Sequence, residues 1–223
     1  GATTSAPYSS GQYNVAMGYE ALKGFTTGNY NIVIGNNAGD AMTTTSETVI
    51  IGAGAGTAIN SADSDRTVAI GNEALRVMTS GGKNTAIGGQ SGYDLTTADY
   101  VTLLGYRSGY NITTGGHNTA LGYYTMLYNV DGTGNTAVGS QAMKGVSGNS
   151  HTDNTAVGSS ALEAITTGDR NTAVGRQAGD AVSTGYNNTI MGASAGTNIT
   201  TGFSNVIIGR AAGYASTDVD KTV

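Results

Sequence analysis

The stretches that decide the fold are NTAVGSSAL at residues 154–162 and NTAVGRQAG at residues 171–179, which lie 17 positions apart. Their core, a glycine preceded by a large aliphatic residue, occurs twelve times, and the steps between copies are 17 residues except for two of 19. Repetition at a fixed short period is the signature of a solenoid, in which each repeat packs only on its neighbours. The repeat glycines are Gly18, Gly35, Gly52, Gly71, Gly88, Gly105, Gly122, Gly139, Gly158, Gly175, Gly192 and Gly209.

The three residues before each repeat glycine predict a strand. The third residue before it is Val, Ile or Thr, the second is a small or large aliphatic residue, and the last is always large and apolar. β-Branched and aliphatic runs favour strands, and alternate side chains point to opposite faces. Both faces are apolar here, so both are expected to be buried. The residues assigned to the core or to a chain–chain interface are Ile34, Ile51, Ile70, Ile87, Leu104, Leu121, Val138, Val157, Val174 and Ile208.

The remaining columns of the repeat predict how the coil closes. Asn precedes the strand in nine of twelve copies, which predicts a ladder of stacked amides. An apolar column seven positions after the glycine, interrupted at Asn129 and Ser216, predicts a second, shorter strand that includes Val146. The two longer repeats place their extra residues near 61–66 and 145–153. These insertions are expected to bulge outward, with His151 as an exposed polar residue.

Together these columns predict an all-β fold, a parallel β-solenoid of twelve rungs. The repeat domain spans residues 14–213, and residues 1–13 and 214–223 are caps or joins to further domains. One apolar side of each strand can fill the coil, but the other would form an exposed stripe, which soluble monomers rarely carry. Burying such a residue is worth about 2 kcal/mol. Parallel association of several chains along the stripe is therefore expected.

Composition excludes several classes of protein. The net charge is -5 without a basic cluster, which argues against binding nucleic acid or an anionic membrane surface. There is no cysteine, so neither a disulfide framework nor a thiolate site is expected. No apolar run approaches the roughly 20 residues that span a bilayer, so no membrane insertion of this segment is expected.

No motif predicts chemistry, and we expect no catalytic residue, cofactor or metal. The glycine-rich residues 52–56 lack the lysine of a phosphate loop and follow the register of the repeat. Asp63 and Asp65 form too thin a cluster for calcium and are interpreted as solvated turn residues. Tyrosines gather in neighbouring repeats, where aromatic faces with polar tips suit sugar or protein contacts. The candidate ligand surface consists of Tyr93, Tyr106, Tyr110 and Tyr123.

The repeat units resemble those of a known class of fibrous proteins. NTAIGGQSG at residues 84–92 and NTAVGSQAM at residues 135–143, with the two units above, are similar to the head repeats of trimeric autotransporter adhesins. They are more similar to repeats in phage tail fibres and related bacterial surface proteins. The resemblance covers about residues 14–213, although the adhesin heads use a shorter period. It implies a left-handed β-roll, a parallel homotrimer, and an extracellular location on a virion fibre or cell surface.

The expected function is therefore that of a non-enzymatic rod in an extracellular trimeric fibre, which mediates or presents attachment to a host. Its partners would be two further copies of itself and a cell-surface glycan or protein receptor. A bacterial trimeric adhesin head is the closest alternative. An ice- or crystal-binding solenoid is another, because seven successive repeats carry Thr in one column, from Thr85 to Thr189. A glycan-cleaving tailspike would need paired carboxylates; Asp40, Glu163 and Asp180 share a column, and only the last two are in adjacent repeats.

Overall fold

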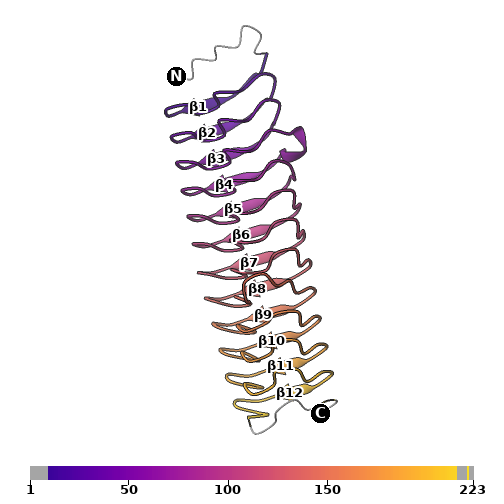
Figure 1. The fold of residues 1–223 in the computed structure, drawn as a ribbon. Helices are drawn as coiled ribbons and strands as arrows, with labels where there is room; N and C mark the ends of the chain where they lie inside the picture. The colour runs from indigo at the N-terminus through magenta and orange to yellow at the C-terminus, as the bar shows by residue number, and fades with distance from the viewer. Residues whose placement is uncertain (1–9, 215–219, 221–223) are drawn as a thin grey trace. The chain divides into compact units, whose positions relative to one another are not determined.

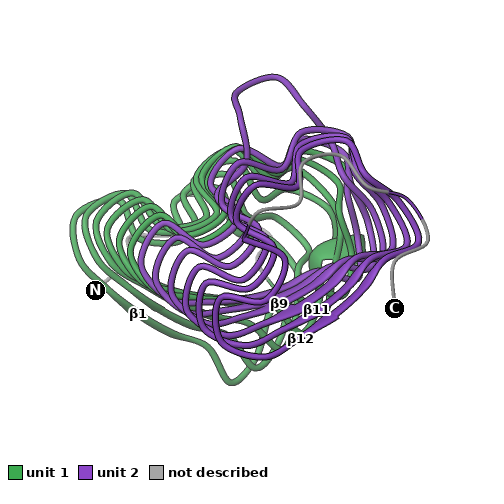
Figure 2. Ribbon diagram, turned by 90° about the horizontal axis from the view of Figure 1, so that it is seen from below, with its two compact units in different colours: residues 1–114 green, residues 115–223 purple. Residues whose placement is uncertain are grey.

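The computed structural model describes residues 10–214 and residue 220, and it shows a chain that coils once per repeat (Figure 1). The chain divides into two compact units, residues 1–114 and residues 115–223, which are coloured green and purple in Figure 2. Within each unit the strands pair in parallel with those of the neighbouring repeats. The predicted all-β parallel solenoid is confirmed in each unit. The predicted end segments, residues 1–13 and 214–223, lie largely outside the described residues.

Each repeat contributes one strand of three residues, and partners in neighbouring strands are residues one repeat apart, as with Thr155 and Thr172. Unit 1 contains β1 (Val15–Met17), β2 (Ile32–Ile34), β3 (Val49–Ile51), the 3₁₀ helix η1 (Ala62–Ser64), β4 (Val68–Ile70), β5 (Thr85–Ile87) and β6 (Thr102–Leu104). Unit 2 contains β7 (Thr119–Leu121), β8 (Thr136–Val138), β9 (Thr155–Val157), β10 (Thr172–Val174), β11 (Thr189–Met191) and β12 (Val206–Ile208).

The repeat glycine ends each strand in a conformation that only glycine adopts easily. Its φ lies between 125° at Gly209 and 142° at Gly35 and Gly122. A β-carbon added to Gly158 would also lie 2.5 Å from the carbonyl oxygen of Gly175, the same residue one repeat later. Neighbouring coils therefore approach backbone to backbone at this position, which explains why the glycine recurs without exception.

Two columns of the repeat fill the interior of the coil, and a large side chain in one is matched by a small residue in the other. The middle residue of each strand from β2 to β12 is buried, and so is the fourth residue after the glycine in every repeat except the last. Where one is large the other is small: Leu75 faces the interior with Ala69, whereas Leu103 is matched by Gly109. A β-carbon on Gly109 would lie 2.7 Å from a methyl carbon of Leu103. Close packing of the coil therefore depends on the pair, not on either column alone.

The predicted amide ladder is confirmed. In unit 2 the side-chain oxygen of Asn118 accepts hydrogen bonds from both the backbone and the side-chain nitrogen of Asn135, at 2.9 and 3.1 Å. The same side-chain nitrogen also donates to the backbone oxygen of His151 at 2.7 Å. Asn154, Asn171, Asn188 and Asn205 continue the ladder in the next coils. These buried amides tie each strand to the turn of the following coil, and their polar atoms are satisfied.

The prediction of a second, shorter strand in each repeat is wrong for the described residues, which contain one strand per repeat. The predicted column itself is buried, as in Met42, Leu95 and Ile165. Backbone bonds to the next coil exist here too, for example from Thr96 nitrogen to Thr113 oxygen at 2.9 Å. The chain turns too often for regular pairing, because residues before this column, such as Gly179 with φ 58°, are left-handed.

Both insertions bulge, as predicted, but their side chains differ from the expectation. Residues 62–64 form η1, visible beside β3 and β4 in Figure 1, and one coil of unit 2 carries a loop that leaves the common outline in Figure 2. Val146, predicted to be a core residue, is 46% exposed. His151, predicted to be exposed, is only 1% exposed. The insertion displaces Val146, and His151 enters the coil beside two polar residues: its backbone nitrogen donates to Asn129 Oδ1 at 3.3 Å, and its Nδ1 lies 3.5 Å from Asn135 Oδ1.

Burial of His151 predicts an acid-dependent loss of stability. Because burial disfavours the imidazolium, the pKa of His151 falls from 6.5 to about 4. The unfolded chain binds this proton as the pH falls below 6.5 and the folded chain does not, so stability present above pH 6.5 is lost toward pH 4. The expected loss is roughly 3 kcal/mol at 1.36 kcal/mol per unit. Urea unfolding at several pH values measures this loss. The decrease in unfolding free energy between pH 6.5 and pH 4 is expected to disappear in His151→Gln and to persist in His117→Gln. Equal decreases in both variants would contradict the assignment.

Candidate functional site

The first and third residues of every strand form a surface that we call the outer strand face. The middle residue of each strand points into the coil: Ala156 is 0% exposed, while Val157, the next residue, is 37% exposed. The ten residues assigned to the core or to an interface all lie on this face, half-buried or exposed in the single chain. They are Ile34, Ile51, Ile70, Ile87, Leu104, Leu121, Val138, Val157, Val174 and Ile208.

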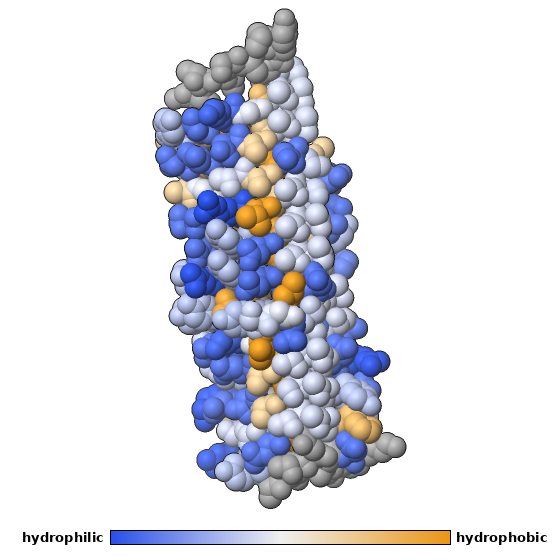
Figure 3. Space-filling view, viewed as in Figure 1, coloured by the Kyte–Doolittle hydropathy of each residue, from blue (hydrophilic) through white to orange (hydrophobic). Residues whose placement is uncertain are grey.

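The outer strand face carries no charged residue in any of the twelve strands. Its third position is aliphatic or Met throughout, and its first position is Val or Ile at the start of the chain and Thr from β5 to β11. In the view of Figure 3, apolar side chains lie singly or in short groups between neutral and hydrophilic ones. An uncharged face repeated in register from coil to coil is typical of a surface that meets another chain.

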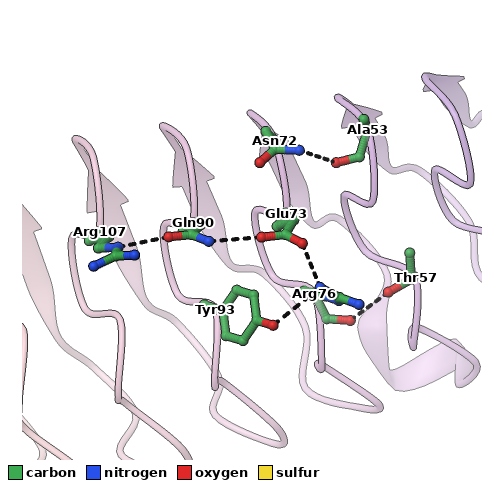
Figure 4. A network of polar contacts seen from close by, with 8 residues as sticks. All are labelled: Ala53, Thr57, Asn72, Glu73, Arg76, Gln90, Tyr93 and Arg107. Atoms are coloured by element: carbon green, nitrogen blue, oxygen red, sulfur yellow. Dashed lines mark hydrogen bonds and ion pairs between the residues drawn. The ribbon is translucent and has the colours of Figure 1, made fainter.

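A second surface lies where each coil turns after the repeat glycine, and in unit 1 it holds a chain of polar contacts (Figure 4). Arg107 Nε donates to Gln90 Oε1 at 2.7 Å, and Gln90 Nε2 donates to Glu73 Oε2 at 2.8 Å. The other Glu73 oxygen accepts from Arg76 at 2.5 Å, and Arg76 also donates to the hydroxyl of Tyr93 at 3.2 Å. Side chains two and five residues after the glycines of neighbouring repeats thus bond to one another and fix their conformations.

The predicted tyrosine surface is partly assembled in unit 1. The rings of Tyr93 and Tyr110 stack with centroids 5.0 Å apart and 9° between their planes. The guanidinium of Arg107 lies 5.1 Å from the Tyr110 ring and 5.3 Å from the Tyr106 ring. Burial, with a smaller contribution from Asp94, raises the pKa of the Tyr110 hydroxyl. Tyr123 belongs to unit 2, where its ring contacts that of Tyr124 at 4.0 Å. A ligand on these rings stays a prediction.

A cavity of about 270 Å³ lies beside this network, over Ala53 and Gly54. Its walls are the side chains of the repeats before and after: Asn36 and Asn37 on one side, Asn72 and Glu73 on the other, with Thr57 and Arg76. Thr57 Oγ1 donates to the backbone oxygen of Arg76 at 2.9 Å, and Asn72 Nδ2 donates to that of Ala53 at 3.1 Å. The walls are therefore anchored to the backbone of adjacent coils (Figure 4).

The assignment of residues 52–56 to the repeat register does not predict this cavity. The register is correct, since Gly52 is a repeat glycine with φ 138°. The missing signal was the absence of side chains at the next two positions. No other repeat carries glycine at the second position after the repeat glycine, and here the first position is only an alanine, Ala53. Two truncated positions between longer neighbours leave a hollow.

The carboxylates discussed from the sequence do not gather into a metal site. Asp63 and Asp65 line a second open cavity, of about 470 Å³, together with Asp99, Arg66 and Lys83. One Asp65 oxygen accepts from Ser46 nitrogen at 2.6 Å, and one Asp99 oxygen from Gly82 nitrogen at 2.6 Å. Among the described residues, no group of three or more His, Cys, Asp or Glu is placed to hold a metal ion.

The acidic column considered for glycan cleavage is also engaged in local contacts. Glu163 pairs with Lys144 at 3.6 Å. Burial raises the pKa of Asp180, and the nearby charge of Glu163 raises it further to a smaller extent. The absence of enzymatic activity stays a prediction.

Comparison with protein-family models, with curated proteins and with solved structures finds no match to this chain. Within residues 10–214 and 220, no helix is long and apolar enough to span a bilayer. A function for the chain must therefore be argued from its own surfaces.

Proposed function

We propose that the chain is a rod segment of an extracellular trimeric fibre, of the phage tail-fibre type, that mediates or presents attachment to a host surface. The observation that supports this proposal is the outer strand face, which is uncharged in every strand and remains partly exposed in a single chain. A face of this kind is suited to another protein chain rather than to water.

The occupant that fits the outer strand face best is the same chain. A second copy aligned in parallel presents uncharged columns at the same spacing, so every coil meets an equivalent coil and the contact closes without unmatched charges. Burying one aliphatic side chain per coil stabilises the contact by about 2 kcal/mol, and this stabilisation adds up over successive coils. The number of three chains comes from the resemblance of the repeats to trimeric fibres and adhesins.

The test is the mass of the protein in solution. The chain is expected to sediment as three copies, and a double variant, Val138→Lys with Val157→Lys, is expected to dissociate, because burying unpaired charges at an interface is costly. The matched control is Ser140→Lys with Ser159→Lys, two exposed positions in the same repeats that follow the glycine and lie off the outer strand face. Analytical ultracentrifugation with circular dichroism separates dissociation from unfolding. A wild-type monomer, or a folded trimer that tolerates the two outer-face lysines, would refute the proposal.

One alternative has a specific observation in its favour. Five consecutive threonines of unit 2, Thr119, Thr136, Thr155, Thr172 and Thr189, lie on the outer strand face one strand apart, as an ice- or crystal-binding surface requires. In the proposed fibre the same residues are covered by partner chains. Thermal hysteresis at high protein concentration separates the two: the fibre proposal expects none, and a clear freezing hysteresis would favour the alternative.

A further inference from the structure

We propose that the cavity over Ala53 and Gly54 binds one ring of an uncharged glycan. The inference deepens the proposed attachment function and rests on it, since it names a receptor class and a place on the chain. The cavity belongs to the turning surface of unit 1, and none of its lining residues lies on the outer strand face.

The cavity is an interruption in a regular surface. At the second position after the repeat glycine, Glu73 and Gln90 carry long side chains that contact each other, and Gly54 carries none. A β-carbon on Gly54 would lie 3.4 Å from Glu73 Cγ, an ordinary contact distance, so a side chain fits sterically at this position. The volume of about 270 Å³ is slightly below the ~300–1,000 Å³ typical of ligand pockets. It suits one sugar ring better than a larger ligand.

The polar groups around the cavity match a neutral ligand with many hydroxyls. Asn36, Asn37 and Asn72 supply amides that both donate and accept, and Thr57 supplies a hydroxyl. The two charged wall residues, Glu73 and Arg76, already neutralise each other at 2.5 Å. A charged ligand would have to compete with this ion pair, whereas a neutral ligand uses the remaining donor and acceptor positions. Convergent polar groups of fixed orientation are the usual source of specificity in such pockets.

Aromatic rings continue the surface on the next coils. The guanidinium of Arg76 lies 5.7 Å from the centre of the Tyr93 ring, and Tyr93 stacks on Tyr110. A sugar chain that places one ring in the cavity and extends past Arg76 would next meet the edge and the hydroxyl of Tyr93, since the ring face is already in contact with Arg76 and Tyr110. The network in Figure 4 holds both parts in one arrangement before a ligand arrives, which reduces the ordering cost of binding.

The test uses nuclear magnetic resonance titration of the full chain with methyl glucoside, methyl galactoside, methyl mannoside and N-acetylglucosamine. We expect at least one to shift the amide signals of Ala53, Gly54 and Asn72, with a dissociation constant on the order of 1 mM for a single ring. N-acetylneuraminic acid, which is negatively charged, is expected to bind at least about tenfold more weakly. The same titration of Gly54→Gln is expected to show no shifts at these residues.

Gly54→Gln is expected to fill the cavity without disturbing the fold, because other repeats carry glutamine at the same position. Gln90, Gln141 and Gln177 occupy the same repeat position with φ between 55° and 59°, close to the 67° of Gly54. The matched control, Ser194→Gln, places the same residue at the same position of unit 2, where φ is 55°, and is expected to bind like wild type.

Three results would overturn the inference: no shifts with any of the four neutral sugars, shifts confined to other residues, or equal binding by Gly54→Gln. The readout is independent of oligomeric state. If the protein is a trimer but binds no sugar, only this inference is contradicted. If it is a monomer that binds a sugar, only the proposed fibre is contradicted.

Discussion

Replacing Gly175 by alanine is expected to prevent unit 2 from closing its coil between β10 and β11. The residue has φ 136°, outside the range that alanine adopts without strain. An added β-carbon would lie 2.6 Å from both the carbonyl carbon and the carbonyl oxygen of Gly192. That backbone cannot withdraw freely, because Gly192 nitrogen donates to Val174 oxygen at 2.8 Å. The backbone strain and the steric clash together are expected to lower the free energy of unfolding by about 4 kcal/mol or more, which is among the largest effects of a single substitution. Urea unfolding followed by circular dichroism measures it.

Gly148 provides the control in the same unit. It also has a positive φ, of 81°, but a β-carbon there would meet no atom within 4 Å. Gly148→Ala therefore tests a positive φ without a clash, and its expected cost is about 1 kcal/mol. If Gly175→Ala proves no more destabilising than Gly148→Ala, then the close approach of neighbouring coils does not constrain the repeat glycine.

The parts of the fold that could be predicted from the sequence are those that repeat. Twelve copies show each column repeatedly: a glycine without exception marks a position that other residues cannot take, and Asn before the strand predicted a ladder. Both follow from stacking, because a residue that contacts its own equivalent in the next coil must satisfy the same geometry each time. The parallel register of β9 on β10 is the direct result.

The parts that could not be predicted depend on contacts between columns or on departures from the period. A column of β-branched and apolar residues is compatible with a strand, and only the left-handed residues around it, such as Gln177 with φ 58°, show that the chain turns there. His151 is buried and Val146 is exposed, the reverse of the prediction, because a two-residue insertion changes which side chains of this segment reach the interior. The cavity over Gly54 could not be predicted for a related reason. It exists because Gly54 has no side chain where neighbouring repeats have one, and a repeat pattern identifies the positions that recur rather than single departures from it.

Asn171→Asp is the substitution that best tests the amide ladder, because it preserves size and shape. Asn171 Nδ2 donates to Asn154 Oδ1 at 3.1 Å and to Gly185 oxygen at 2.8 Å. An ionised aspartate presents an oxygen to both acceptors, in a site that is 1% exposed. Two lost hydrogen bonds and a buried, unpaired charge are expected to cost about 3–5 kcal/mol at neutral pH. Urea unfolding at pH 7 against wild type measures this loss.

The pH dependence of that loss separates the ladder from a general sensitivity of the coil. Two acceptors and burial disfavour the ionised carboxyl, so its pKa in the folded state would rise above its ordinary value. The unfolded chain releases this proton first as the pH increases, and the deficit relative to wild type is therefore expected to grow from pH 4 to pH 7. Asn187→Asp, one residue earlier in the next coil and exposed, is expected to show neither the loss nor the trend. A deficit that is independent of pH, or shared by the exposed position, would mean that the buried amides fill space without carrying the bonds that join one coil to the next.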